Sequence, residues 1–289
     1  MPKPKILIQL DPDPHASVFD AVVAVDAGVE QLFQYHSVQP EQVRDLVHGA
    51  MFTRSPQDLS STAVFIGGSN VAQGEELLRQ VIKCFFGPMR VSALLDANGA
   101  NTTAAAAVLA AAKHMELKGA TATILAGTGP VGQRAARLLV RQGATVRLAS
   151  RTLPKAEEAC QAIRSRVPEA KLEPVATASA DESAAAVAGA QIVIAAGAAG
   201  IQLLSAAVLK QAASLQVAID LNAVPPLGIE GLEVMDKAKE RAGVFCYGAI
   251  GVGGTKMKIH RAAIERLFTR NDLVLDAEEV FALGQELGK

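Results

Sequence analysis

Cysteine is scarce in this chain of 289 residues, and its spacing carries no metal or redox motif. The three cysteines, Cys84, Cys160 and Cys246, are far apart in the sequence, and no C-x-x-C pair occurs. Isolated thiols in odd number argue against a disulfide framework or a zinc knuckle. The five histidines form no H-x-x-x-H or H-E-x-x-H pair, so no metal is expected either.

Tryptophan, an excess of charge of one sign and a long apolar run are also missing. The 28 basic and 29 acidic residues give a formal net charge of -1, so no basic groove for nucleic acid is expected. The longest apolar run, Ala104–Ala112, is too short to span a bilayer, and residues 1–5 lack the apolar region of a signal peptide. These absences predict a soluble cytoplasmic protein that binds neither nucleic acid nor membrane.

Hydrophobic residues, by contrast, make up 50% of the chain, which is enough for a substantial core, and the length favours two domains. Over the first hundred residues, strand-like apolar runs alternate with helix-like segments. Strands are expected at residues 6–10, 30–33, 62–66 and 91–95, and helices at 17–27, 40–47 and 71–85. This alternation predicts parallel βα units and hence an α/β domain.

An alanine-rich helix, expected from residue 101 to about 115, separates this region from a second alternating one. There we expect strands at 121–126, 144–149, 191–195 and 215–219, a glycine-rich turn at 248–254, and helices at 255–268 and 276–287. The last helix is expected to pack back on the first domain. The predicted division is therefore 1–100 with about 272–289 for a smaller domain, and 101–271 for a Rossmann-type domain.

A glycine fingerprint follows the strand predicted at 121–126. It reads Gly127-Thr128-Gly129-Pro130-Val131-Gly132 and is followed by a helix-like segment. The first glycine permits a tight turn, the second lets the backbone approach a pyrophosphate, and the third lets helix and strand pack closely. Strand, fingerprint and helix in this order favour dinucleotide binding over a glycine turn that binds nothing.

The end of the next strand distinguishes NADP from NAD. An NAD site usually has an acidic residue there, whereas this chain has Ser150, Arg151 and Thr152, followed by Lys155. A guanidinium suits a 2′-phosphate, although most arginines are simply solvated. The pattern predicts NADP, with NAD as a weaker alternative. Further candidates for contact with the cofactor are Ala196, Gly197 and Asn222.

Polar residues also gather where the first-domain strands end, and α/β proteins bind ligands at that edge. They are Asp11, Asp13, Ser17, Asp20, Ser69, Asn70, Asp96, Asn98 and Asn101. Each could instead be a helix cap or turn former. In a second segment, Gly251–Lys258, we expect glycines before a helix, with Lys256 in its first turn facing a ligand or solvent.

Seven sequence blocks together resemble the bacterial NADP-dependent methylene-tetrahydromethanopterin dehydrogenases. They are residues 17–20 (SVFD), 65–68 (FIGG), 85–88 (FFGP), 98–103 (NGANTT), 126–132 (AGTGPVG), 222–229 (NAVPPLGI) and 251–258 (GVGGTKMK). The resemblance implies an α/β fold with an NADP domain, a smaller α/β pterin domain and a cleft between them. It also implies a homo-oligomer that oxidises the methylene bridge of a reduced pterin in one-carbon metabolism.

The candidate residues that the resemblance places on cleft segments are Phe19, Asp20, Asp96, Asn98, Thr102 and Lys256. Phe19 would press on the pterin face or simply pack in the core, and Asp20 or Asp96 would hold the pterin amino edge or offset the cationic product. Lys256 would contact the substrate or the nicotinamide ribose. No general base is needed, because a nitrogen lone pair drives hydride loss.

Two other interpretations remain open, and two related enzyme families are disfavoured. Tetrahydrofolate could replace tetrahydromethanopterin as the carrier, because the two share the reacting rings. Folate-linked dehydrogenase/cyclohydrolases use a first-domain lysine, which the segment around Phe52–Ser55 lacks, and shikimate dehydrogenases carry an N-x-T-x-P-x-K motif that is absent here. A non-catalytic NADP-binding redox sensor is a further alternative.

Overall fold

The computed structural model describes residues 3–288, and the chain forms two compact units. The first comprises residues up to Thr102 together with those from Met257 onward, and the second comprises Thr103–Lys256. The first unit is discontinuous, but its second boundary lies near residue 257 instead of the expected 272. The reason is that the helix α9 (Ala249–Leu267) continues without a break, and its C-terminal half packs in the first unit.

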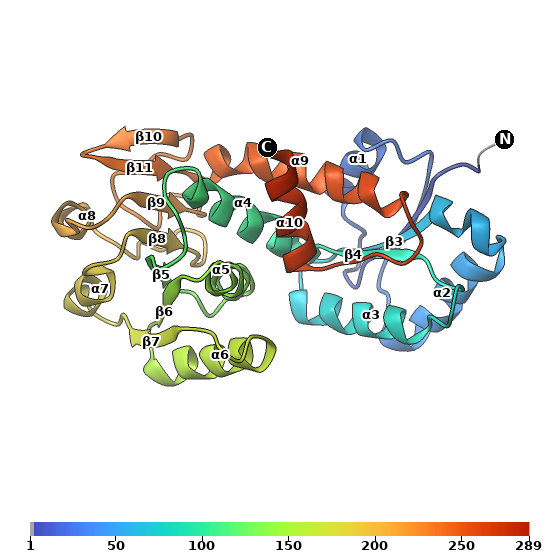
Figure 1. The fold of residues 1–289 in the computed structure, drawn as a ribbon, viewed down its shortest axis with the longest axis horizontal. Coiled ribbons are helices and arrows are strands. Elements are labelled where there is room, and N and C mark those ends of the chain that lie inside the picture. The colour runs from blue at the N-terminus through green and yellow to red at the C-terminus, as the bar shows by residue number, and fades with distance from the viewer. Residues whose placement is uncertain (1–2, 289) are drawn as a thin grey trace. The chain divides into compact units, whose positions relative to one another are not determined.

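The first unit contains a five-stranded parallel sheet in the order β12-β4-β3-β1-β2. Its strands are β1 (Ile6–Leu10), β2 (Gln31–Tyr35), β3 (Thr62–Ile66), β4 (Ser92–Leu95) and β12 (Val274–Leu275). Helix α1 (Val18–Asp26) covers one face, and α2 (Val43–Phe52) and α3 (Val71–Lys83) cover the other (Figure 1). The chain ends in α10 (Ala277–Leu287), and short 3-10 helices lie at Pro40–Gln42, Pro56–Ser61 and Ala97–Gly99.

The second unit contains a seven-stranded sheet in the order β10-β11-β9-β8-β5-β6-β7. The strands are β5 (Thr121–Leu125), β6 (Thr145–Ser150), β7 (Leu172–Ala176), β8 (Ile192–Ala195), β9 (Val217–Asp220), β10 (Lys237–Arg241) and β11 (Val244–Tyr247). Only the β10–β11 pair is antiparallel among those described. Helices α5 (Pro130–Arg141) and α6 (Leu153–Arg166) cover one face, and α7 (Ala180–Val187) and α8 (Ala206–Gln211) cover the other (Figure 1).

Local signals explain several element boundaries. The Ser17 hydroxyl accepts a hydrogen bond from the Asp20 backbone N–H and so caps α1, as expected. Gly28, just past the end of that helix, has a φ of 77°, which glycine adopts without strain. Helix α4 (Ala100–Ala112) has almost no amphipathic character, and its alanines at 104–107 are buried, as the alanine-rich sequence predicts.

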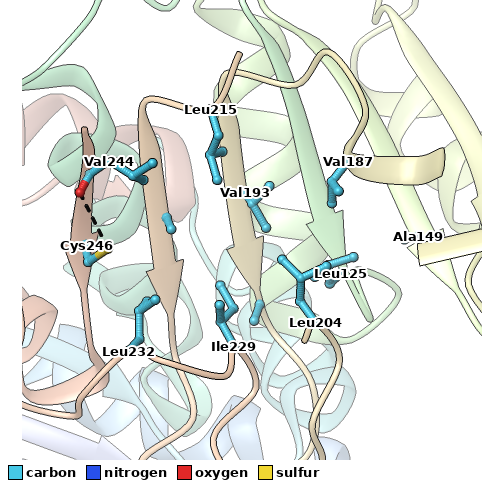
Figure 2. Close-up of a cluster of buried hydrophobic side chains, with 12 residues drawn as sticks. Leu125, Ala149, Val187, Val193, Leu204, Leu215, Ile229, Leu232, Val244 and Cys246 are labelled. Carbon is cyan, nitrogen blue, oxygen red and sulfur yellow. Dashed lines mark hydrogen bonds between the residues drawn. The ribbon is translucent and has the colours of Figure 1, made fainter. Parts of the chain in front are cut away.

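The core of the second unit is built from the continuous apolar strands that a parallel sheet covered on both faces requires. Leu125 and Val193 project from neighbouring strands and pack with Leu204, Ile229 and Leu232 from the loops (Figure 2). Ala218 of β9 belongs to the same cluster. All three cysteines are free thiols, and burial raises the pKa of Cys246 to about 11. Among residues 3–288, no helix combines the length and apolar character needed to cross a membrane.

The sequence led us to expect a turn at 248–254, but α9 begins at Ala249, directly after Gly248, and includes the rest of this segment. A Cβ on Gly251 would lie 1.7 Å from the Asp236 carbonyl oxygen, and one on Gly248 would lie 2.0 Å from the Glu233 carbonyl oxygen. These glycines therefore let the start of the helix pass directly over the loop before β10. Lys256 consequently lies in the interior of a helix and not in its first turn.

Candidate cofactor and substrate sites

Each sheet reverses its strand order at one place, and ligands of open α/β sheets bind beyond the carboxyl ends of the strands at such a point. In the first unit the reversal lies between β1 and β3, and in the second between β5 and β8. The residues that follow these strands are Asp11 and Gly67 in the first unit, and the fingerprint and Ala196 in the second. The strand order thus indicates two candidate ligand sites, at the same strand ends that the sequence patterns indicate.

The glycines of the fingerprint turn differ in the space around them. A Cβ on Gly132 would lie 2.5 Å from the Gly127 carbonyl oxygen, so only glycine permits this approach of helix to strand. A Cβ on Gly129 would meet a single atom, the Ala196 carbonyl oxygen at 4.0 Å, so the space above Gly129 is open. Helix α5 begins at Pro130, directly after Gly129, and the start of a helix is where the first N–H groups are available to a ligand.

Side chains and backbone tighten the turn further. The Gln133 side-chain amide donates to the Thr128 carbonyl at 2.6 Å, and the Gly127 N–H donates to the Ala149 carbonyl at 2.8 Å. Gly197 lies close to this turn, because a Cβ there would meet Leu203 Cδ1 at 2.8 Å and Ala126 Cβ at 3.3 Å. The loop after β8 therefore packs against the loop after β5, as expected for the two walls of a nucleotide site.

A pocket of about 450 Å³ lies beside this turn, within the second unit. Arg151, Ser179 and Ser183 contribute polar groups. The 201–205 segment contributes both apolar and polar side chains, and Leu125 and Ala126 are apolar. Arg151 is exposed, while Ser150 is buried at the end of β6. Thr152 is the N-cap residue of α6 without a side-chain capping hydrogen bond, and Lys155 lies exposed in the first turn of that helix.

The Asn222 side chain is hydrogen-bonded within the loop that follows β9. Its side-chain amide donates to the Pro226 carbonyl, and its side-chain oxygen accepts from the Val224 N–H. These bonds hold the 222–226 loop, which contains a cis peptide bond between Pro225 and Pro226. Asp220, which sequence analysis overlooked, is fully buried at the end of β9 and accepts from the N–H groups of Asn222 and Ile229. Burial raises the pKa of Asp220 above its ordinary value, although these hydrogen bonds oppose the shift.

In the first unit, acidic side chains gather at the reversal point. Buried Asp11 accepts hydrogen bonds from the backbone N–H groups of Asp13 and Ser17, both at 3.0 Å. Asp20 lies near it, because a Cβ on Gly67 would meet one oxygen of Asp20 at 3.3 Å and one of Asp11 at 3.4 Å. The structure therefore brings together Asp11 and Asp20, which sequence analysis could only assign to the same edge.

An aromatic stack stands beside Asp20, and its central member was not selected from sequence. His260, a fully buried residue of α9, lies between Phe65, at a ring-centroid distance of 5.6 Å, and Phe19, at 6.4 Å. His260 Nε2 is 3.9 Å from Asp20 Oδ1. The signal was available, since His260 falls on the same apolar helix face as Ala263, Ile264 and Leu267. Phe19 retains half of its surface, with 51% exposed.

Asp96 and Thr102 are hydrogen-bonded to each other. Buried Asp96 accepts hydrogen bonds from the N–H groups of Asn101 and Thr102 and from the Thr102 hydroxyl at 2.6 Å. These contacts cap the start of α4, which is the alternative role recognised for such residues. Asn98 has a φ of 52° and donates its N–H to the Gly68 carbonyl. Of the six residues predicted on cleft segments, Phe19 and Asp20 both lie next to His260, and Asp96 is hydrogen-bonded to Thr102.

Comparison with known proteins shows which family the chain is similar to. Residues 18–98 match the family described as methylene-tetrahydromethanopterin dehydrogenase, N-terminal, and residues 114–228 match one described as putative NAD(P)-binding. The bifunctional protein MdtA of Methylorubrum extorquens is 45% identical over 287 residues, covering 98% of this chain and 99% of the relative. The chain belongs to the methylene-tetrahydromethanopterin dehydrogenase family. This confirms the predicted family.

A second family member from the same organism is more distant. It is named NAD(P)-dependent methylenetetrahydromethanopterin dehydrogenase, and it is 32% identical over 306 residues, with 98% of each chain covered. Both relatives match this chain over nearly its whole length, so the dehydrogenase family extends across both units.

Solved structures support the fold alone. A shikimate 5-dehydrogenase from Mycobacterium fortuitum has a TM-score of 0.54 at 16% identity and covers 98% of both chains. A quinate dehydrogenase from Corynebacterium glutamicum, solved in complex with NAD, has a TM-score of 0.52 at 12% identity, covering 98% of this chain and 100% of that one. The predicted α/β class with a Rossmann-like domain is confirmed.

Proposed function

We propose that this protein transfers a hydride from methylene-tetrahydromethanopterin to NADP and forms methenyl-tetrahydromethanopterin. The observation that carries the proposal is membership of the dehydrogenase family together with an open, glycine-bounded turn fit for a dinucleotide. NADP, when bound, supplies the hydride acceptor. As the hydride leaves the methylene carbon, the lone pair of an adjacent ring nitrogen forms the C=N bond of the methenyl cation.

The residues of the chain need only bind, orient and exclude water, since the reaction moves no proton. The fingerprint would hold the pyrophosphate on backbone N–H groups, with Gly129 leaving the space it needs. Phe19, half exposed and backed by His260, would offer a ring face to the pterin. Asp20 would hold the pterin amino edge or offset the positive charge of the product. Lys256 would contact the substrate or the nicotinamide ribose.

We assign NADP rather than NAD as the preferred cofactor because of the cations around the end of β6. Arg151 lines the pocket beside the fingerprint, and Thr152 and Lys155 follow it at the start of α6. No acidic residue stands at that strand end to bind ribose hydroxyls. We also propose that the active protein is a cytoplasmic homo-oligomer, and that catalysis needs no metal.

Methylene-tetrahydrofolate is a second candidate substrate. The 45% identical relative is named bifunctional, and the two carriers share the pterin and the reacting imidazolidine ring. A site that binds only these shared rings would accept both carriers.

Initial rates of NADPH formation test the proposal, with each methylene carrier combined with NADP and then with NAD. We expect turnover with methylene-tetrahydromethanopterin and NADP. Replacing Arg151 with Gln should lower kcat/KM for NADP by about 10- to 100-fold, as expected from losing roughly 1.5–3 kcal/mol of charged hydrogen bonding. The value for NAD should stay unchanged.

Lys210→Ala is the matched control, because it also removes one positive charge from an exposed position of the second unit. Equal losses with NADP and NAD in the Arg151 variant would contradict 2′-phosphate recognition. Tight NADP binding without turnover on either carrier would overturn the substrate assignment and favour the redox-sensor alternative.

A further inference from the structure

A fully buried carboxylate lies at the end of β9, and the proposed reaction gives it no role. Asp220 is the last residue of that strand and is 0% exposed. The loop that follows it contains the block Asn222–Ile229, one of the seven that resemble the dehydrogenase family. A carboxylate removed from water needs compensating hydrogen bonds, so its donors show which part of the chain it holds.

The donors to Asp220 are backbone N–H groups of this one loop. The Asn222 N–H donates to Asp220 Oδ1 at 3.0 Å, and the Ile229 N–H donates to Oδ2 at 2.8 Å. The backbone of Gly228 also hydrogen-bonds to the carboxylate. An ionised carboxylate only accepts hydrogen bonds, which suits several N–H donors at once. Because the donors come from both ends of the loop, this single side chain holds the loop closed.

Gly228 lets the loop pass close to the carboxylate. A Cβ on Gly228 would lie 2.8 Å from Asp220 Oδ1 and 3.0 Å from the Cβ of Ala195, the last residue of β8. A larger residue would therefore have to push the loop away from the ends of β8 and β9. The position of Gly228 is thus set by Asp220 on one side and by Ala195 on the other.

The Gly228 carbonyl in turn holds a segment that lines the pocket beside the fingerprint. The N–H groups of Leu203 and Leu204 donate to this carbonyl at 2.8 and 3.0 Å, and the Glu230 N–H donates to the Leu204 carbonyl at 2.9 Å. Leu204 and Ile229 are buried in the same apolar cluster (Figure 2). Leu203 and Leu204, which both line the pocket, form what we call the leucine wall.

The leucine wall also reaches the neighbourhood of the fingerprint turn. A Cβ on Gly197 would meet Leu203 Cδ1 at 2.8 Å and the Cβ of Ala126 at 3.3 Å. Leu203 therefore packs against Gly197, which itself lies close to the residue that precedes Gly127. A shift of Leu203 would change the shape of the pocket next to the space proposed for the pyrophosphate.

We propose that Asp220 is a positioning residue for dinucleotide binding, because it fixes the 222–229 loop and this loop fixes the leucine wall. The inference rests on the proposed cofactor site. Asp220 is fully buried, so it acts through two successive sets of backbone hydrogen bonds. The leucine wall contains no group assigned to the 2′-phosphate. Its displacement therefore weakens the binding of NADP and NAD alike, whereas the loss of Arg151 weakens the binding of NADP alone.

Calorimetric titration of Asp220→Asn, in the full chain, with NADP and with NAD tests this role. The amide has the size of the carboxylate, but its NH2 group would confront a backbone N–H, so the loop must move. We expect the Kd to rise about tenfold or more for both cofactors.

Asp236→Asn is the matched control. Asp236 is another buried carboxylate of the second unit that accepts from a backbone N–H, that of Glu233, and it lies outside the set of described residues that line the pocket. The control should leave both Kd values unchanged, even if it destabilises the fold.

Hydrogen exchange without cofactor gives a measurement that does not depend on binding. Because the Leu203 and Leu204 N–H groups donate to the Gly228 carbonyl, peptides covering residues 201–205 should lose protection in Asp220→Asn and keep it in Asp236→Asn. Gly228→Ala presses on the same carboxylate and should have both effects. It replaces Asp220→Asn if that variant does not fold.

A rise in Kd no larger than that of Asp236→Asn, or unchanged exchange at 201–205, would overturn the proposal. A loss of affinity for NADP alone would also overturn it, because it would assign Asp220 to recognition of the 2′-phosphate. In either case the cofactor site would stand. An unsubstituted chain that binds neither NADP nor NAD would instead overturn the cofactor site, and this inference with it.

Discussion

At the scale of single residues, two glycines of the fingerprint turn differ in the space that an added side chain would find. A Cβ on Gly132 would strike the backbone of Gly127 at 2.5 Å, whereas a Cβ on Gly129 would enter open space. We therefore expect Gly132→Ala to lower the free energy of unfolding by about 1–3 kcal/mol, the usual cost of overpacking. Urea denaturation followed by circular dichroism measures this loss.

Gly129→Ala is the matched variant and should separate binding from stability. Its unfolding free energy should stay within about 0.5 kcal/mol of the unsubstituted chain, because the new methyl group touches nothing closely. Its affinity for NADP should fall by about tenfold or more, since the methyl group fills the space that the pyrophosphate needs. Calorimetric titration measures the affinity. Unchanged affinity would show that the dinucleotide lies elsewhere.

At the scale of elements, the start of α9 explains why glycine recurs where a helix would usually avoid it. Gly251→Ala would place its Cβ 1.7 Å from the Asp236 carbonyl oxygen, so the helix or the loop before β10 must move. We expect the free energy of unfolding to fall by about 1–3 kcal/mol or more, because the backbone cannot move away from the new methyl group as easily as a flexible side chain. Thermal and urea unfolding of this variant measure the loss.

Gly254→Ala in the same helix should have the opposite effect. This exposed glycine has nothing within 4 Å of an added Cβ, so alanine gains helix propensity of about 0.8–1.0 kcal/mol without a clash. If both variants destabilised the protein equally, the segment would not be helical in solution.

At the scale of the whole molecule, the fingerprint turn proposed to bind the cofactor and the pocket beside it lie in one unit. NADP at about 100 times its Kd should raise the unfolding free energy by roughly 2.7 kcal/mol. Hydrogen exchange should show the strongest new protection within residues 103–256, around the fingerprint and the 177–183 segment. Strongest protection within residues 3–102 would contradict the assignment of the cofactor to the second unit.

Local patterns in the sequence were sufficient for much of this protein. Strands β1, β3 and β5 were predicted within a residue because buried parallel strands are continuous apolar runs bounded by turn residues. The cap at Ser17 and the fingerprint depend only on residues nearby in the chain, so the sequence predicts them as well. In contrast, β7 was not predicted, because its sequence Leu172–Ala176 contains a proline and a glutamate and resembles a loop.

The sequence by itself determined the α/β class, the glycine turn after β5 and the family, since each depends on residues close together in the chain or on ordered blocks. Only the tertiary structure decided that Gly251 packs against Asp236 inside a helix, that Asp96 caps α4, and that His260 stands between Phe19 and Phe65. These contacts join residues that the chain brings together only on folding. Whether a glycine serves a turn or a close helix contact therefore depends on neighbours that no local pattern specifies.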